Sequence, residues 1–177
     1  MFIFKYYILE ESISEIMSGN SNYLEDFEGQ IELHFNDNQY GHIFPSISSY
    51  NELMLWWFAI LNEASIKLLK NDYIMFYVPD TTFRFEMIKN GEYCIVNRVV
   101  TDYWPGGCVT TAKVDACEII TSGDKILVLN FVNEINEKTK SFIKEVIAIN
   151  SKVEKSEQLE DIINLNRELE CLVKAYS

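Results

Sequence analysis

An apolar run of nine residues, Leu53 to Leu61, constrains the fold of this chain more than any other stretch. It contains no charged residue, and no Gly or Pro follows it before Pro79. Ser49 and Glu52 have the S-x-x-E spacing of a capping box, in which each side chain bonds a backbone N–H that the first helical turn leaves free. We therefore expect a helix from Ser49 to Lys70. Because this helix is apolar on every side, it should be covered on every side, between a sheet and further helices.

The length and composition predict one folded domain. The chain has 177 residues, of which 48% are hydrophobic and 14% aromatic, so a core is expected despite the net charge of −12. No apolar run reaches the roughly 18 to 20 residues of a membrane-spanning helix. The apolar stretch Phe2 to Leu9 runs directly into Glu10 and Glu11 without a small-residue cleavage site, which favours a strand over a signal peptide. We expect a single cytoplasmic domain over residues 1–177, with no membrane segment.

Alternating apolar and polar residues predict a β-hairpin from Gly29 to Phe44. Asn36-Asp37-Asn38 has turn chemistry, because Asn and Asp tolerate positive φ and bond their own backbone. A turn centred on Asp37-Asn38 would place Phe35 opposite Tyr40 and Leu33 opposite His42.

A second group of strands is expected after the apolar helix. Tyr73 to Val78 is a continuous apolar run, which is typical of an interior strand. Phe83 to Met87 alternates, and the pair Asn90-Gly91 predicts a hairpin turn before a returning strand from Tyr93 to Val100. Val109 to Ile120 again has the character of a strand.

Helical periodicity dominates the C-terminal third. Apolar positions recur at steps of three and four from Val128 to Ile149, and we expect a long helix that begins at Thr121. A strand over Lys125 to Phe131 is the alternative for the start of this segment. Ser156 to Ala175 is predicted to form a last amphipathic helix.

Together these elements predict an α+β fold. We expect an antiparallel sheet of about six to seven strands, with a buried central helix and two C-terminal helices packed on one side. Ser12 to Phe27 should be mainly a surface loop, in which Ile13 to Met17 has the composition of a short helical turn.

The charge is unevenly distributed along the chain. No Lys or Arg occurs between Tyr6 and Ile66. The acidic residues of this stretch are Glu10, Glu11, Glu15, Glu25, Asp26, Glu28, Glu32, Asp37, Glu52 and Glu63. A solvated acidic surface would explain the pattern. The functional alternative is a surface that meets a basic partner, because a one-signed patch accelerates encounter with the opposite sign. Direct nucleic-acid binding is not expected, since it requires basic groups that neutralise phosphates.

We place the partner-binding surface on the polar face of the predicted hairpin and on the acids around it. Carboxylates there can pair with Lys or Arg of a partner, and Arg pairs are stronger when they are bidentate. The loop Thr101 to Cys108 offers an indole as a further anchor, unless that ring folds back onto the core. The candidate partner-binding residues are Glu25, Asp26, Glu28, Glu32, His34, Asp37, Asp102 and Trp104.

Signatures of catalysis and of cofactor binding do not occur in the sequence. It contains no Gly-rich phosphate loop, no G-x-S-x-G elbow and no H-E-x-x-H. His34 and His42 should point to opposite faces of the hairpin, which argues against a shared metal site. The four cysteines form no C-x-x-C pair and are expected to be reduced thiols. They are Cys94, Cys108, Cys117 and Cys171. We therefore expect no enzyme activity, no metal and no cofactor.

The first half of the chain combines an acidic loop, the strand Gly29 to Phe35 with Gly41 on its return, and a Ser-capped helix with Leu53 and the pair Trp56-Trp57. In these features it resembles small cytosolic immunity proteins of bacterial polymorphic toxin systems. Such proteins bind a cognate toxin domain, often a nuclease, and occlude its active site. The resemblance implies a protein that neutralises a basic toxin domain.

Two other functions stay open. One is a small-molecule-binding or enzymatic domain, with an aromatic pocket between sheet and helices. The other is an oligomerising module, in which the long C-terminal helices pair between chains.

Overall fold

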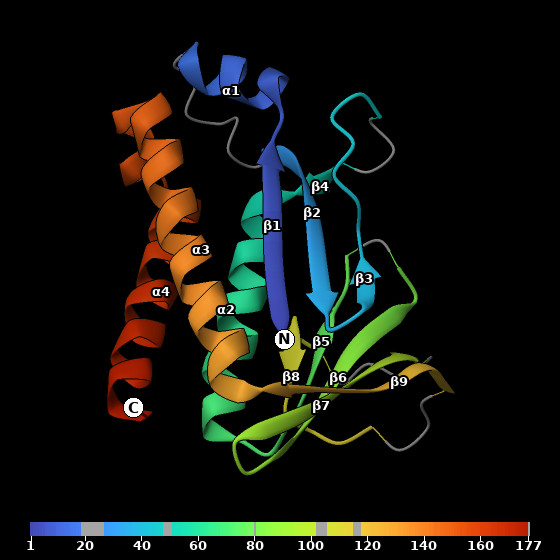
Figure 1. Cartoon of the computed structure of the whole chain (residues 1–177). Helices are drawn as coiled ribbons and strands as arrows, with labels where there is room; N and C mark the ends of the chain where they lie inside the picture. Colours follow the sequence, from blue (N-terminus) through green and yellow to red (C-terminus); the bar gives the residue numbers. More distant parts are fainter. Residues whose placement is uncertain (19–26, 48–50, 80, 102–105, 115–117, 177) are drawn as a thin grey trace.

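The computed structural model describes residues 1–18, 27–47, 51–79, 81–101, 106–114 and 118–176. Helices and antiparallel strands are mixed along the chain, which confirms the predicted α+β class. The strands are divided between two sheets rather than gathered in one (Figure 1).

The first sheet has four strands and is entirely antiparallel. Its strands are β1 (Phe2–Ile8), β2 (Glu28–Phe35), β3 (Asn38–Tyr40) and β4 (Glu52–Leu53). The outer edge of β1 is covered by side chains of helix α3 (Val128–Ile149). The N–H of Phe2 donates to Asn130 Oδ1 at 2.8 Å, and the N–H of Phe4 donates to Glu134 Oε1 at 3.2 Å. These bonds occupy backbone groups that would otherwise accept an added strand.

The second sheet has five antiparallel strands in the order β8-β5-β6-β7-β9. Its strands are β5 (Tyr73–Tyr77), β6 (Phe83–Asn90), β7 (Tyr93–Val100), β8 (Val109–Thr110) and β9 (Glu118–Leu127). β5 lies between two neighbours, so the predicted interior strand is confirmed. The β6–β7 hairpin is confirmed as well, with Asn90 paired to Tyr93 and Gly91 at positive φ in the turn.

The helices gather beside the two sheets (Figure 1). They are α1 (Glu10–Met17), α2 (Met54–Lys70), α3 and α4 (Glu157–Tyr176), with a short 3₁₀ helix at Ser151–Lys155. α3 and α4 are the two predicted C-terminal helices, and both contact α2. No helix in the described part of the chain is both long enough and apolar enough to cross a membrane.

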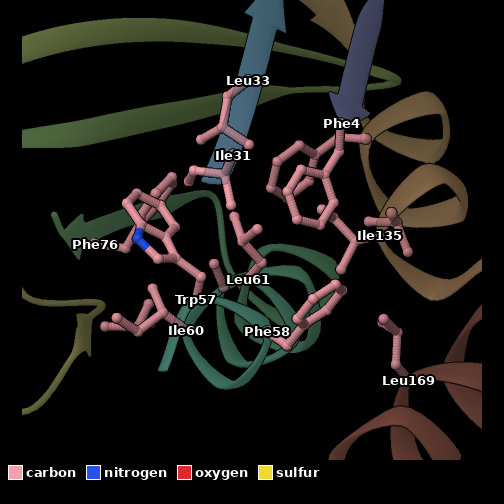
Figure 2. Packing of buried hydrophobic residues seen from close by; sticks show 14 of the residues in the cluster. Phe4, Ile31, Leu33, Trp57, Phe58, Ile60, Leu61, Phe76, Ile135 and Leu169 are labelled. Atoms are coloured by element: carbon pink, nitrogen blue, oxygen red, sulfur yellow. The ribbon is translucent and has the colours of Figure 1, made fainter. Parts of the chain in front are cut away.

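Helix α2 is the centre of the hydrophobic core (Figure 2). The side chains around it come from β1, β2, β5, α3 and α4, so both sheets and the long helices contribute to one cluster. Trp57 and Phe58 are fully buried, and the Phe58 ring stacks on Phe142 with centroids 4.0 Å apart. Trp56 is different, because 52% of it is exposed. The expectation that α2 is covered on every side is therefore wrong at this position.

A buried polar cluster joins the three long helices, and we call it the helix junction (Asn62, Asn136, Thr139 and Asn166). Asn62 Nδ2 donates to Thr139 Oγ1 at 2.8 Å and to the Phe58 carbonyl at 2.7 Å. Asn166 Nδ2 donates to Asn136 Oδ1 at 3.1 Å. The members of the helix junction come from all three helices, so their hydrogen bonds fix how α2, α3 and α4 are aligned.

The predicted starts of two helices are wrong. α2 begins at Met54, and Glu52 belongs to β4, where it pairs with Gly29 of β2. The Met54 N–H donates to the Phe27 carbonyl at 3.0 Å, so a backbone partner replaces the predicted Ser49 cap; Ser49 itself lies outside the described residues. α3 begins at Val128 rather than Thr121, because β9 continues to Leu127 in its pairing with β7.

The predicted register of the first hairpin is also wrong. Phe35 pairs with Asn38, not with Tyr40, and Tyr40 lies opposite Leu33. A two-residue turn with Asn36 at φ 54° produces this register.

Two segments differ from their predicted type. Glu10–Met17 is helical, with Ser12 and Ile16 buried on one face. The helical turn expected at Ile13 to Met17 is therefore confirmed, but the helix begins three residues earlier, and the loop prediction is wrong at Ser12. Residues 19–26 lie outside the description. The stretch from Val109 to Ile120 is not one strand either. Its start belongs to β8, which pairs with β5, and its end belongs to β9, which pairs with β7 at the opposite edge of the second sheet.

Candidate partner-binding surface

Polar side chains of β1 and β2 lie on the face of the first sheet that does not pack against the helices. β2 alternates, with Ile31, Leu33 and Phe35 buried and Glu32 and His34 partly exposed. The pleat of a strand sends successive side chains to opposite faces, so the sequence pattern alone produces this division. The predicted alternation is therefore present at Glu32 and His34, whereas Gln30, which was expected on the same polar face, is fully buried.

The carboxylate of Glu32 is the centre of what we call the Glu32 network (Lys5, Glu32, His34 and the Ile43 N–H). Glu32 Oε2 lies 2.9 Å from Lys5 Nζ and 3.0 Å from His34 Nε2, and Glu32 Oε1 accepts from the Ile43 N–H at 3.3 Å. Only 14% of the Glu32 side chain is exposed. Burial raises its pKa, but the bonds from His34, Lys5 and Ile43 outweigh burial and lower the pKa to about 2.

The segment after β3 is held against the same face. Gly41 has φ 74°, and a Cβ there would collide with the Ile31 carbonyl oxygen, so glycine is required where the chain leaves β3. Gln30 is fully buried; its side chain accepts from the Phe44 N–H at 2.7 Å and donates to the Ile47 carbonyl at 2.9 Å. The apolar side chains of Phe44 and Ile47 remain about half exposed.

A hollow of about 500 Å³ lies between the start of α1 and this segment, and we call it the acidic cleft. Its lining residues are Tyr7, Leu9, Glu10, Glu11, Pro45, Ser46 and Asn51. Glu10 and Glu11 are exposed in the first turn of α1, where the partial positive charge of the helix end stabilises carboxylates.

Hydrogen bonds fix the walls of the acidic cleft. The Glu28 N–H donates to Ser12 Oγ at 3.1 Å, which attaches α1 to β2, and Asn150 Nδ2 donates to the Ile16 carbonyl at 2.9 Å, which attaches it to the end of α3. On the other wall, Asn51 Nδ2 donates to Glu28 Oε2 at 2.9 Å. A partner would therefore meet a surface that is already ordered, which lowers the entropic cost of binding.

The cations nearest in sequence to the cleft acids are already paired. Lys5 binds Glu32, and Lys67 binds Glu63 at 2.6 Å. Within the described ranges no ion pair involves Glu10 or Glu11. The two carboxylates therefore remain available to a cation from outside.

The predicted site residues are distributed over several environments. The Glu28 carboxylate accepts a hydrogen bond from Asn51, and the Glu32 carboxylate binds Lys5 and His34. Asp37 is exposed in the β2–β3 turn. The structure brings Glu28, Glu32 and His34 onto one strand and leaves Asp37 at its far end. The other predicted site residues lie outside the described residues; they are Glu25, Asp26, Asp102 and Trp104.

Sequence reasoning missed Glu10, Glu11 and Asn51 as site residues. A signal for the first two was present, because Ile13 and Ile16 are spaced as on one helical face and place both acids in a first turn. Asn51 had no such signal, since its place in the cleft depends on the pairing of β4 with β2.

The thiols of Cys94 and Cys108 both have raised pKa values. Burial raises the pKa of the Cys94 thiol to about 12. It also raises the pKa of Cys108, with Glu63 adding to the effect and Lys67 opposing it, so both thiols are held in the protonated form. No group of three or more metal-ligating side chains converges in the described ranges.

Space for a small molecule between the two sheets is limited. The hollow beside Phe35, Tyr40, Phe85 and Arg98 has about 50 Å³. Ligand pockets occupy roughly 300 to 1,000 Å³, so this one has room for a few waters only.

Compared with known protein families, curated proteins and solved structures, the chain matches none.

Proposed function

We propose that this protein is a non-enzymatic, cytoplasmic binding protein that neutralises a basic protein partner, and that the partner is a bacterial toxin domain. The observation that carries the proposal is the acidic cleft, in which the Glu10 and Glu11 carboxylates form no ion pair with another residue that the structure describes. The resemblance of the first half of the chain to immunity proteins supports the choice of partner.

The acidic cleft suits a lysine or arginine side chain of the partner. Tyr7 and Leu9 line it together with the two carboxylates, so the aliphatic stem of a basic side chain finds apolar surface and its head finds charge. Exposed Phe44 and Ile47 beside it supply further apolar contact. Occluding a basic active surface in this way needs no chemistry from the immunity protein.

The test is binding to, and protection from, a basic toxin domain, for which the first candidate to express is the C-terminal region of the protein encoded by the neighbouring open reading frame. Reversal of Glu10 and Glu11 to lysine should weaken affinity about 100-fold and abolish growth protection, because it replaces two attractions with two repulsions. The matched control reverses Glu92 and Glu118, two exposed acids of the second sheet, and changes the net charge by the same amount. Equal weakening in both variants would assign the effect to net charge alone and refute the cleft as the site. Failure of the unaltered protein to protect would refute the toxin partner.

A further inference from the structure

A second hollow, of about 500 Å³, lies between the start of α2 and the start of α4, and we call it the Trp56 groove. Its walls are mainly apolar. They are formed by Leu53, Leu55, Trp56, Ala59, Gln158, Asp161 and Ile162.

Trp56 distinguishes this groove from ordinary surface. Its neighbour Trp57 is fully buried, and the Trp57 indole N–H donates to Glu52 Oε2 at 2.9 Å. Trp56 is half exposed although it follows buried Leu55. An exposed indole beside an apolar hollow has the features of an interface anchor, since tryptophan combines a large apolar area with few rotatable bonds.

Both walls of the Trp56 groove come from stretches of sequence without a basic residue. The α2 wall belongs to the stretch between Tyr6 and Ile66, and no Lys or Arg occurs between Lys155 and Arg167 in the α4 wall. Glu157 lies one helical turn before Asp161, so the two carboxylates share one side of α4. Neither carboxylate takes part in an ion pair with any other described residue. The groove is therefore apolar within and acidic at one rim.

We propose that the Trp56 groove docks a segment of a partner protein in which an apolar side chain stands beside a lysine or arginine. The apolar side chain packs on exposed Trp56 and on the partly exposed Leu53 and Ala59, and the cation reaches Asp161. A second copy of this chain is a poor occupant, because it would bring another acidic rim and its own net charge of −12 against the first.

This docking surface is separate from the acidic cleft, although their linings come close together in the sequence. Asn51 lines the cleft, and Leu53, two residues later, lines the groove. Among the described residues, no side chain lines both hollows. Failure of one proposal therefore leaves the other standing.

The probe is the tetrapeptide acetyl-Lys-Leu-Leu-Lys-amide, titrated into the ¹⁵N-labelled protein. Loss of one indole signal in Trp56→Phe assigns the Trp56 side chain, and that signal should shift saturably. Trp56→Ala should abolish the peptide's binding, measured by calorimetry, and Asp161→Asn should weaken it about 3- to 10-fold. The matched controls are Ile119→Ala, an exposed apolar residue of β9, and Glu160→Gln, beside Asp161 but outside the groove lining; both should bind like the unaltered protein.

Two comparison peptides make the result decisive. Acetyl-Lys-Ser-Ser-Lys-amide keeps the charge without the apolar anchor, and acetyl-Glu-Leu-Leu-Glu-amide keeps the anchor and reverses the charge. Both should bind at least about 5-fold more weakly. Equal binding by either, or no shift of the Trp56 indole, would overturn the proposal. A concentration-dependent dimer that Trp56→Ala dissociates would overturn it too, in favour of a second copy.

Discussion

The helix junction and the Glu32 network are both clusters of hydrogen-bonded polar side chains, but they lie in opposite environments. Asn62 and Thr139 in the junction are fully buried, and their bonds join helices that are far apart in sequence. In the Glu32 network, Lys5 is 52% exposed and its partner Glu32 belongs to the adjacent strand. Similar bonds therefore have different consequences for the protein.

The difference teaches where polar groups stabilise the fold and where they shape a surface. A buried polar group that loses its hydrogen-bond partner finds no water to replace that partner, so the loss lowers the free energy of unfolding substantially. A partly exposed ion pair exchanges its partner for water and contributes little to stability. Changes in the helix junction should reduce stability strongly, whereas changes in the Glu32 network should reduce it less and also alter the charge at the surface.

The largest effect is expected for Asn62→Asp. The substitution keeps the size of the side chain but replaces the amide donor, which bonds Thr139 Oγ1 and the Phe58 carbonyl, with a buried carboxylate. We expect a loss of about 3 to 5 kcal/mol in the free energy of unfolding, measured by urea denaturation at neutral pH. Asn164→Asp, at an exposed position on α4, is the control and should change stability by less than about 0.5 kcal/mol. Similar small losses in both variants would show that the junction is hydrated.

An intermediate effect is expected for Glu32→Gln. The neutral side chain loses its charged bonds with Lys5 and His34, and stability at neutral pH should fall by about 1 to 2 kcal/mol. The folded-state pKa of Glu32 is about 2, below the ordinary value of 4.5. The contribution is thus fully present above pH 4.5 and is lost as the pH falls through about 2. Urea denaturation across this range should show the difference between the two proteins shrinking toward low pH; a difference that is constant with pH would contradict the charged role of Glu32.

The smallest effect is expected for Lys5→Ala. Because the Lys5 side chain is half exposed, removing its 2.9 Å pair with Glu32 should reduce stability by only about 0.2 to 1 kcal/mol. Added salt screens an exposed pair, so the difference should diminish further when urea denaturation is repeated in high salt. A loss as large as that of Asn62→Asp would show that the Glu32 network behaves like the buried junction.

Regular patterns along the chain predicted much of the fold. The stripe from Val128 through Phe142 to Val146 is buried along α3, and the last helix agrees with its prediction within a residue or two. The β6–β7 hairpin agrees as well, because the Asn-Gly pair and the alternation on both sides act over a few residues. These features succeed since each depends on neighbours in sequence.

Boundaries and registers were less predictable, because distant partners decide them. The Met54 N–H bonds Phe27, and the Val128 N–H bonds the Glu92 carbonyl at 2.9 Å, so both helix starts depend on strands elsewhere. The buried polar residues of the helix junction were not predicted at all. Their pairing is visible only once three helices are packed together.

The candidate site was predicted in part. The sequence located the acidic charge in the N-terminal third, and the alternation of β2 placed Glu32 and His34 on one polar face. It did not show that Lys5 neutralises Glu32, or that Glu10 and Glu11 line a cleft with a segment more than thirty residues later. Those facts depend on the pairing of β1 with β2 and on the path of the chain after Gly41.

The sequence by itself determined the fold class, the type of most elements and the unequal distribution of charge, because periodicity and composition are local properties of the chain. The tertiary structure decided the division of the strands into two sheets and the exposure of Trp56 next to buried Trp57. It also decided which carboxylates, such as that of Glu32, form ion pairs within the protein. The physical reason is that burial and pairing are energies of contact between distant segments. A run such as Leu53 to Leu61 requires a cover, but only the packed chain specifies which of its side chains is left uncovered.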